Sequence, residues 1–463
     1  MRLLVKGVRV VDGTGKPAYH GDILIVGDRI TAIGKLSARV ADETLDGTGM
    51  IATPGFIDPY SSIDRDFAFL SDPSHERYLL QGVTTVIGGH GGASLAPRAP
   101  TAPHIPARGG AAVNTDWRTV AEFYKTARQL VLGVHFGTFL GKENADRYVE
   151  SLKPRNEADA ARFMLQLEDE ARECGMFGLS FSASDTMKRL SRGARGPAHN
   201  PEFATFSIAV GRVLDGRAAS ALAESMRALP NRRALLTELH PHPETSDALA
   251  RLVNRTDEKT TGTDVRFALV PSGARMRPVR DIFAQTSHRE AERRAAGAAI
   301  TTRSRIGGPL RHAWLEGKTL GEFAQSRELA VLRALAKLAE LEPDATIEED
   351  AVDEVFLEHA LFHPRSLISA AESGSHAGTP PFLEFLRRAS AKLAIEKVIE
   401  KITGAPAAFL GVRDRGVVRE GGYADLALLK DLAVSAVIVG GRVAVRDGRY
   451  TGARAGKVLR RTQ

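Results

Sequence analysis

Cysteine is almost absent from this chain, because Cys174 is the only one in 463 residues. A single thiol excludes an internal disulfide and a zinc cluster built from several cysteines. Cys174 ends a helix-like run that precedes a strand, so we expect a packed apolar side chain. The sequence therefore predicts neither disulfides nor a cysteine-based metal cluster.

Long apolar runs are missing as well. No stretch of the sequence reaches the length that is needed to span a membrane. The first residues lead directly into a strand-like segment, in place of a charged leader followed by an apolar run. We therefore expect a cytoplasmic protein.

Positive charge is in moderate excess and is dispersed along the chain. Lysine and arginine number 63 against 56 aspartates and glutamates, which gives a formal net charge of +7 and a sequence pI near 9.5. The arginines are not interleaved with aromatic residues on one segment, as a nucleic-acid surface would require. We expect a small-molecule substrate or ligand, and the positive net charge suits an anionic one. We expect no nucleic-acid or membrane partner. A homo-oligomer is compatible with the sequence.

The pattern of apolar residues divides the chain into two short all-β ends and a long middle that alternates strands and helices. Such alternation over some 350 residues predicts parallel βα units, and an α/β fold closed as a (β/α)8 TIM-like barrel is the common solution at that size. The predicted strands are 83–87, 130–134, 177–181, 234–236 and 265–270, and the predicted helices are 116–129, 157–174, 202–214 and 246–253.

Residues 277–311 depart from this alternation and are rich in arginine and alanine. We expect a helix and a loop over the barrel mouth. The segment is either a functional lid or a plain insertion. Two further amphipathic helices are predicted at 319–341 and 346–360, the second opening with a Thr346-Ile-Glu-Glu349 capping box.

Several motifs occur in a characteristic order along the chain. They are Pro54-Gly-Phe-Ile-Asp58, Gln81-Gly-Val-Thr-Thr-Val86, Gly178-Leu-Ser180 and Gly422-Tyr-Ala-Asp-Leu426. With these motifs the chain resembles the amidohydrolase superfamily, and within it the D-aminoacylase (N-acyl-D-amino-acid deacylase) group. The resemblance implies a metal-bearing barrel at 54–412 and a small β-sandwich domain formed by both chain termini, 1–53 and 413–463.

The ligand positions that the resemblance implies are mostly substituted. The family's His-x-His on the first strand corresponds to Tyr60 and Ser62, and neither residue is an ordinary zinc ligand. The family's cysteine turn corresponds to Gly89-His90-Gly91-Gly92, in which His90 either contacts a metal or substrate or is a turn residue. The ligand on the sixth strand falls near Leu269, which cannot coordinate an ion.

Two further segments offer replacement groups. The family's fifth-strand histidine corresponds to Glu238 or His240, which share one face of a strand and either hold a divalent ion or form a polar cluster. The family's catalytic aspartate falls in 369–376, where Glu372 is the candidate general base and His376 a second base or ligand; a solvated loop is the alternative.

Other polar residues near these positions have less specific meanings. Asp58 belongs to the family frame and is expected to stabilise the strand end, whereas Asp64 and Asp66 form an acidic pair that could hold magnesium or calcium. The resemblance implies that Ser180 and Ser182 line the substrate pocket, together with the substituted positions Tyr60 and Ser62.

The sequence is compatible with three functions. The first is hydrolysis of the C–N bond of an N-acyl amino acid or a similar small anionic amide, with an altered site that holds at most one divalent metal, zinc foremost, or none. The second is a catalytically silent barrel that binds a small molecule or partners an active homologue. The third is metal-free chemistry by Glu238, His240, Glu372 and His376.

Overall fold

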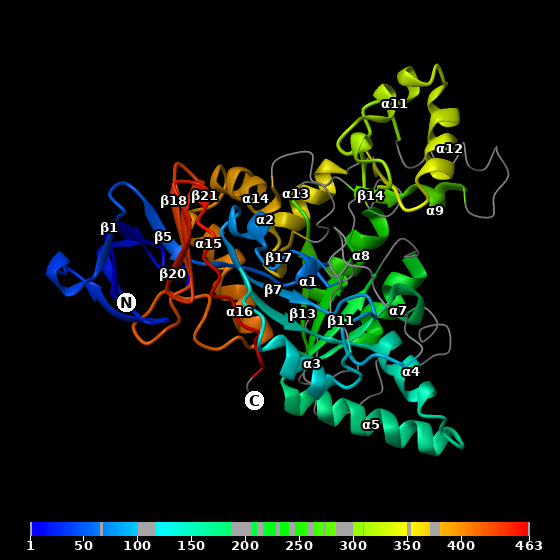
Figure 1. Cartoon of the computed structure of the whole chain (residues 1–463), viewed down its shortest axis with the longest axis horizontal. Helices are drawn as coiled ribbons and strands as arrows, with labels where there is room; N and C mark the ends of the chain where they lie inside the picture. Colours follow the sequence, from blue (N-terminus) through cyan, green and yellow to red (C-terminus); the bar gives the residue numbers. More distant parts are fainter. Residues whose placement is uncertain are drawn as a thin grey trace.

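The computed structural model describes three assemblies of strands and helices along one chain. The described residues are 2–64, 68–100, 116–186, 205–210, 216–227, 232–239, 246–257, 263–271, 275–283, 300–308, 310–349, 353–370 and 380–461. In Figure 1 a sheet from both chain ends lies on one side, parallel strands with helices form the centre, and a smaller unit projects from the far side. Among the described helices, none combines the length and the apolar character that crossing a bilayer requires.

A nine-stranded sheet joins the two ends of the chain. Its order is β21-β20-β19-β18-β5-β1-β2-β3, with β4 paired to β1. The antiparallel pairing of β5 with β18, which places Ala52 opposite Leu428, connects the N-terminal half to the C-terminal half. The strands are β1 (Arg2–Val10), β2 (Tyr19–Val26), β3 (Arg29–Gly34), β4 (Glu43–Asp46), β5 (Ile51–Pro54), β18 (Leu426–Lys430), β19 (Ala433–Val439), β20 (Arg442–Arg446) and β21 (Arg449–Tyr450). A short 3₁₀ helix, η1 (Ala38–Val40), precedes β4.

Parallel strands form two further sheets in the centre. One has the order β6-β7-β8 and the other the order β17-β13-β12-β11-β10-β9. Every pairing within them is parallel. The strands are β6 (Phe56–Asp58), β7 (Val83–Gly88), β8 (His135–Thr138), β9 (Leu140–Gly141), β10 (Leu179–Phe181), β11 (Thr205–Ala209), β12 (Arg233–Thr237), β13 (Asp264–Leu269) and β17 (Ser366–Ile368). The predicted α/β class with parallel strands is therefore confirmed.

The two parallel sheets are connected at both edges. On one edge only Phe139 separates β8 from β9, so the chain itself continues from one sheet into the other. On the other edge the Ser369 hydroxyl donates to the Tyr60 carbonyl oxygen, and the Ala370 amide donates to Asp58 Oδ2 at 3.3 Å. These bonds link the end of β6 to the residues that follow β17, and among the described residues the two strands share no ladder of backbone hydrogen bonds.

Helices follow the parallel strands and cover them (Figure 1). Their apolar faces pack on the large core, as Phe123 of α3 and Phe385 of α14 illustrate. The helices are α1 (Ala68–Ser71), α2 (Glu76–Leu79), α3 (Val120–Ala127), α4 (Lys142–Ser151), α5 (Glu157–Cys174), α7 (Gly216–Arg227), α8 (Ser246–Asp257), α13 (Glu354–Phe362), α14 (Pro381–Ser390), α15 (Ile395–Ile402) and α16 (Gly404–Leu410).

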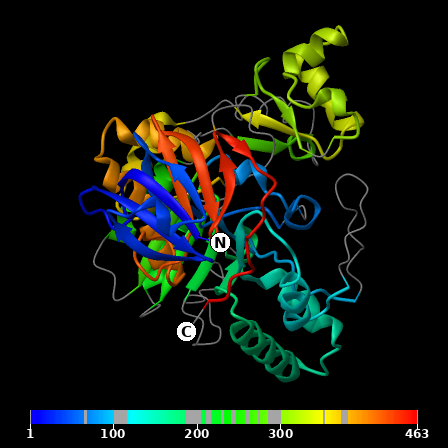
Figure 2. The ribbon, with the colours of Figure 1, turned by 60° about the vertical axis from the view of Figure 1, so that its left-hand side comes forward.

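The projecting unit extends well beyond the predicted insertion at 277–311. It contains a three-stranded sheet of order β14-β16-β15 and its own apolar cluster, which includes Val279, Phe323 and Leu335. Figure 2 shows that it stands away from the rest of the molecule in a second view. Its elements are β14 (Arg275–Pro278), α9 (Val279–Phe283), β15 (Ile306–Gly307), η2 (Ala313–Leu315), α11 (Leu320–Ser326), α12 (Val331–Leu341) and β16 (Thr346–Glu349). The lid role stays a prediction.

Four local predictions were wrong. The single helix predicted at 319–341 is divided into α11 and α12. Thr346 and Glu349 begin and end strand β16 rather than a capping box, because the segment pairs with both β14 and β15. The predicted helix at 202–214 contains strand β11, and the strand predicted at 130–134 begins at His135. Both of the last two shifts concern residues of the candidate sites described below.

Candidate active site

The inner face of the parallel strands is filled by apolar side chains. Ile57 of β6, Ile87 of β7, Leu235 of β12 and Leu367 of β17 form one buried cluster with Phe139. Residues of α16, including Phe409 and Leu410, belong to the same cluster. This layer is closely packed, and the polar Ser207 of β11 stands in register with Leu235 of the layer.

A glycine turn directs His90 inward from the end of β7. Gly89 has a φ of +77°, and a Cβ at this position would stand 2.3 Å from the carbonyl oxygen of Phe139. Only glycine fits this left-handed, close-packed conformation. The Gly89 amide also donates to Asp64 Oδ2 at 2.6 Å, so the buried Asp64 fixes the turn. Asp64, which was predicted to hold magnesium or calcium together with Asp66, therefore accepts a backbone amide through Oδ2. Asp66 lies outside the described residues.

The imidazole of His90 is held at both nitrogens. Nε2 lies 2.9 Å from the Ile87 carbonyl oxygen, and Nδ1 lies 2.8 Å from the Ser207 hydroxyl. A carbonyl oxygen can only accept, so in the neutral ring Nε2 carries the hydrogen and Nδ1 accepts from Ser207. The rings of Tyr60 and Phe139 pack on His90 with centroids at 5.0 Å. The side chain is 1% exposed.

Ser207 and Ser180 are neighbours on the inner face. They pair in register between β11 and β10, and both are fully buried. Ser180 Oγ accepts the Gly92 amide at 3.3 Å, so the glycine turn after β7 contacts both strands. The half-buried Ser182 contacts the Ser184 hydroxyl at 3.1 Å. Of the predicted pocket residues, Tyr60 and Ser180 therefore lie beside the His90–Ser207 pair.

The seam between β6 and β17 holds a buried carboxyl group. Asp58 accepts the Tyr60 amide at 3.1 Å and the Ala370 amide at 3.3 Å. Burial raises the pKa of Asp58 to about 7, against the opposing effect of hydrogen bonds from Tyr60, Ser369 and Ala370. The predicted role of Asp58 at the strand end agrees with these contacts. Ser62 is buried nearby in the sequence, at 9% exposure.

The end of β12 supplies a hydroxyl and a carboxylate. Thr237 is fully buried, and its Oγ1 has no hydrogen-bond partner in the part of the chain that the structure describes. The next residue, Glu238, is half-buried. Its φ of +59° is a left-handed backbone conformation that is energetically costly for a glutamate. His240, which the sequence pairs with Glu238, lies outside the described residues, as do Glu372 and His376.

The described donors do not fit a divalent ion. Among the described residues, no group of three or more histidine, cysteine, aspartate or glutamate side chains could hold one. Both nitrogens of His90 have protein partners, and Tyr60 and Ser62 stand at positions where the resemblance implies histidines. A zinc site needs about four donors at roughly 2.0 to 2.3 Å. The described residues therefore support no chemical step through a metal ion.

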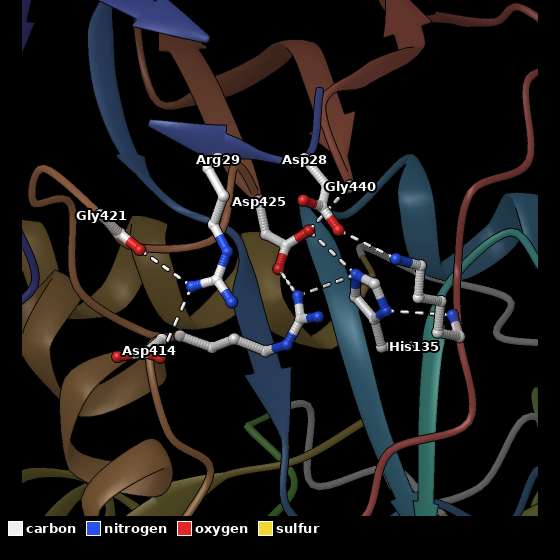
Figure 3. A network of polar contacts seen from close by, with 9 residues as sticks. Asp28, Arg29, His135, Asp414, Gly421, Asp425 and Gly440 are labelled. Carbon is white, nitrogen blue, oxygen red and sulfur yellow. Dashed lines mark hydrogen bonds and ion pairs between the residues drawn. The ribbon is translucent and has the colours of Figure 1, made fainter. Parts of the chain in front are cut away.

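A second buried histidine lies in a charged network that the sequence analysis missed (Figure 3). His135 Nδ1 accepts the Lys457 amide at 3.0 Å, so Nε2 carries the hydrogen and donates to Asp425 Oδ1 at 2.9 Å. Asp425 also forms an ion pair with Arg415 and accepts the Gly440 amide at 2.7 Å. The network joins β8 of the central strands to the sheet formed by the chain ends.

Aromatic contacts extend this network. The guanidinium groups of Arg415 and Arg29 both lie over the ring of Tyr423, at 3.9 and 3.6 Å. Burial, reinforced by the charges of Arg415 and Lys457, lowers the pKa of His135 well below its usual range. The network is thus built around a neutral histidine and a buried ion pair.

Ser207 was also missed, although a signal for it exists. Thr205-Phe-Ser-Ile208 alternates polar and apolar residues at period two, which predicts a strand, whereas the sequence analysis favoured a helix across it. His135 was missed because the predicted strand stopped one residue before it. Asp425 stands within the quoted motif Gly422-Tyr-Ala-Asp-Leu426, without a partner having been assigned.

Comparisons with known proteins give consistent results. No family model matches the chain. It is 26% identical over 458 residues to an N-acyl-D-glutamate deacylase of Alcaligenes xylosoxydans xylosoxydans, covering 92% of this chain and 86% of the relative. It is 26% identical over 494 residues to the N-acyl-D-aspartate deacylase of the same organism, covering 98% and 94%.

Solved structures resemble the fold over nearly its whole length. A D-aminoacylase crystal structure superposes with a TM-score of 0.74 at 22% identity, covering 99% of each chain. The N-acyl-D-glutamate deacylase of Bordetella bronchiseptica, complexed with zinc and a phosphonate inhibitor, gives a TM-score of 0.75 at 20% identity and the same coverage. The zinc belongs to that protein's structure.

Proposed function

We propose that this chain, whose homologues and structural neighbours are N-acyl-D-amino-acid deacylases of the amidohydrolase superfamily, hydrolyses the amide bond of an N-acyl-D-amino acid with an acidic side chain. The observation that carries the proposal is the 26% identity to two such deacylases over 92% and 98% of the chain. The relatives' names specify D-glutamate and D-aspartate, and the net charge of +7 suits a dicarboxylate substrate.

The proposed fold is a closed (β/α)8 barrel with a small β domain from both termini. Two features support closure: the continuity of β8 with β9, and the contacts of Asp58 and Tyr60 with the residues that follow β17. In such a barrel the reacting groups lie at the carboxyl ends of the strands. His90 and Glu238 follow the carboxyl ends of β7 and β12, and Ser180 and Ser207 lie in the middle of β10 and β11.

The pocket proposed for the substrate lies above the packed inner layer. Tyr60, Ser62, Ser180 and Ser182 are its proposed lining, of which Ser182 is half-buried and the others are buried. Hydroxyl groups of this kind orient a carboxylate by hydrogen bonds. The divalent ion of the sequence analysis stays a prediction, for which elemental analysis of protein purified without chelator is the direct measurement.

A hydrolysis panel tests the proposed function. We expect release of amino acid from N-acetyl-D-glutamate or N-acetyl-D-aspartate, with slower release from N-acetyl-D-leucine and from N-acetyl-L-glutamate. The measurement is the free amine formed over time, compared with heat-unfolded protein. Absence of release from every member of the panel, with and without added zinc, would overturn the proposal.

A catalytically silent binding protein is the second candidate function. It is favoured by one observation: His90 and Ser207 are 1% and 0% exposed, so both polar groups are enclosed by protein. This candidate predicts that N-acetyl-D-glutamate raises the melting temperature by mass action without being consumed. Consumption of the ligand at a rate that depends on folded protein excludes it.

A further inference from the structure

We propose that Ser207 is the nucleophile and His90 the general base of the hydrolysis, so that the reaction passes through an acyl ester on Ser207. This inference rests on the proposed function and specifies its reacting groups. It takes as its starting point that the described residues do not assemble a metal site, whereas they do assemble a serine and a histidine in hydrogen-bond contact.

The geometry of the pair is that of an activated serine. Ser207 Oγ lies 2.8 Å from His90 Nδ1, which is within the range for proton transfer from a nucleophile to its base. The Ile87 carbonyl oxygen accepts the opposite ring hydrogen at 2.9 Å and thereby fixes the tautomer in which Nδ1 is the acceptor. Contacts with Tyr60 and Phe139 hold the ring in place. Nucleophile, base and orienting group are thus all present.

The neighbouring strand supplies a donor for the developing oxyanion. Ser207 pairs in register with Leu235, whose side chain lies in the inner cluster, and Thr237 lies two residues further along the same face of β12. The buried Thr237 hydroxyl makes no hydrogen bond within the described residues. A buried hydroxyl without a partner is costly, and it becomes satisfied when it donates to a substrate oxygen.

The half-buried Glu238 directly follows the fully buried Thr237 at the end of β12. The left-handed backbone at Glu238 is a local strain of the kind that clusters at functional sites.

The reaction balances without an added reagent. Ser207 Oγ forms a bond to the amide carbonyl carbon while its proton moves to His90 Nδ1. The C–N bond then breaks as His90 returns that proton to the leaving amine, which leaves the acyl ester. Water next attacks the ester carbon, giving its proton to His90, and the carboxylic acid departs as Ser207 Oγ recovers the proton.

The test combines covalent labelling with hydrolysis by the full-length protein. Native protein is incubated with phenylmethylsulfonyl fluoride, and the modified residue is identified by peptide mass spectrometry. Peptide mapping separates Ser207 from Ser180, its buried register neighbour, which therefore serves as an internal control. We expect the adduct on Ser207, its loss in Ser207→Ala and slower formation in His90→Gln.

Hydrolysis of N-acetyl-D-glutamate is measured in parallel in the presence of a zinc chelator. We expect chelator-resistant hydrolysis that falls on the order of 10³-fold or more in Ser207→Ala. The matched control is Thr205→Val, which removes another buried hydroxyl from the same strand, two residues earlier. It is expected to keep the wild-type rate, and thermal unfolding checks that each variant is folded.

The outcomes separate this inference from the proposed function. Chelator-resistant hydrolysis with a Ser207 adduct supports both, and a Ser207 adduct without hydrolysis of the panel supports the reactive pair while the substrate assignment fails. Hydrolysis that a chelator abolishes and that Ser207→Ala retains overturns the pair and leaves the hydrolase function standing. Absence of both label and hydrolysis overturns both.

Discussion

His90 and His135 are two buried histidines on neighbouring strands, and they differ in what surrounds them. His90 follows β7, and its contacts are a hydroxyl, a carbonyl oxygen and two aromatic rings. His135 opens β8 and contacts Asp425, whose carboxylate is paired with Arg415. The exposures are 1% and 0%, so burial alone does not distinguish the two residues.

The difference separates a group that can exchange a proton from one that is fixed. A base needs a partner whose proton it can accept, and Ser207 offers one to His90. His135 accepts a backbone amide at Nδ1 and donates to a carboxylate at Nε2, so both nitrogens are committed to joining two parts of the chain. We therefore assign chemistry to the first histidine and structure to the second.

The largest expected effect is a loss of stability when the network around His135 is disrupted. Asp425→Asn leaves the buried Arg415 without its counter-charge, which should cost about 3 to 5 kcal/mol in the free energy of unfolding measured in urea. The control is Glu340→Gln, which removes the exposed ion pair with Lys337 and should change stability by less than about 1 kcal/mol. Equal stability of the two variants would refute the structural role of the network.

The next effect is a loss of hydrolysis when His90 is replaced. His90→Gln keeps a polar side chain but removes the base, so hydrolysis should fall by about 10²- to 10⁴-fold. His135→Gln is the matched variant, and it should hydrolyse at the wild-type rate per folded molecule while unfolding at a lower urea concentration. If the two substitutions affect hydrolysis equally, the division between the histidines is wrong.

Asp58 should make stability fall as the pH rises. Its folded pKa of about 7 lies above the ordinary 3.8, so the stabilisation is complete below pH 3.8 and is lost as the pH passes through 7. Between pH 5 and pH 8 the loss should be about 2 to 3 kcal/mol. Urea unfolding at both values should show that Asp58→Asn lacks this component. A pH dependence identical to that of the wild type would contradict the assignment.

His75 should give a smaller effect of opposite sign. Burial lowers the pKa of His75 from 6.5 to about 4, so the unfolded chain binds the extra proton and stability falls as the pH drops below 6.5. Between pH 7.5 and pH 5 the loss should be about 2 kcal/mol. His75→Asn suits the φ of +49° and should remove this part, leaving that of His135. Retention of the full loss in urea unfolding would count against His75.

Much of the fold followed from the sequence, because apolar periodicity is a local signal. The helix predicted at 157–174 matches α5 at both ends, where Asn156 caps the first turn and Gly175 the last. Strands β12 and β13 were predicted to within one or two residues. The prediction failed at β11, where the alternation of polar and apolar residues from Thr205 to Ile208 was overlooked.

The site was less accessible to sequence reasoning, because its contacts join residues that are far apart in the chain. The sequence singled out His90 and Tyr60, and the structure brings their rings together. The partner of His90 is 117 residues away, and no spacing rule connects the two. The same holds for His135 and Asp425, which are 290 residues apart. Glu372, His376 and His240 stay predictions outside the described residues.

A crystal structure of the protein after treatment with the sulfonyl fluoride would examine the serine–histidine assignment at atomic detail. The account predicts continuous density from Ser207 Oγ to the sulfonyl group, with His90 Nδ1 beside it. Density for a divalent cation bound by His90 and Glu238, with Ser207 unmodified, would contradict it.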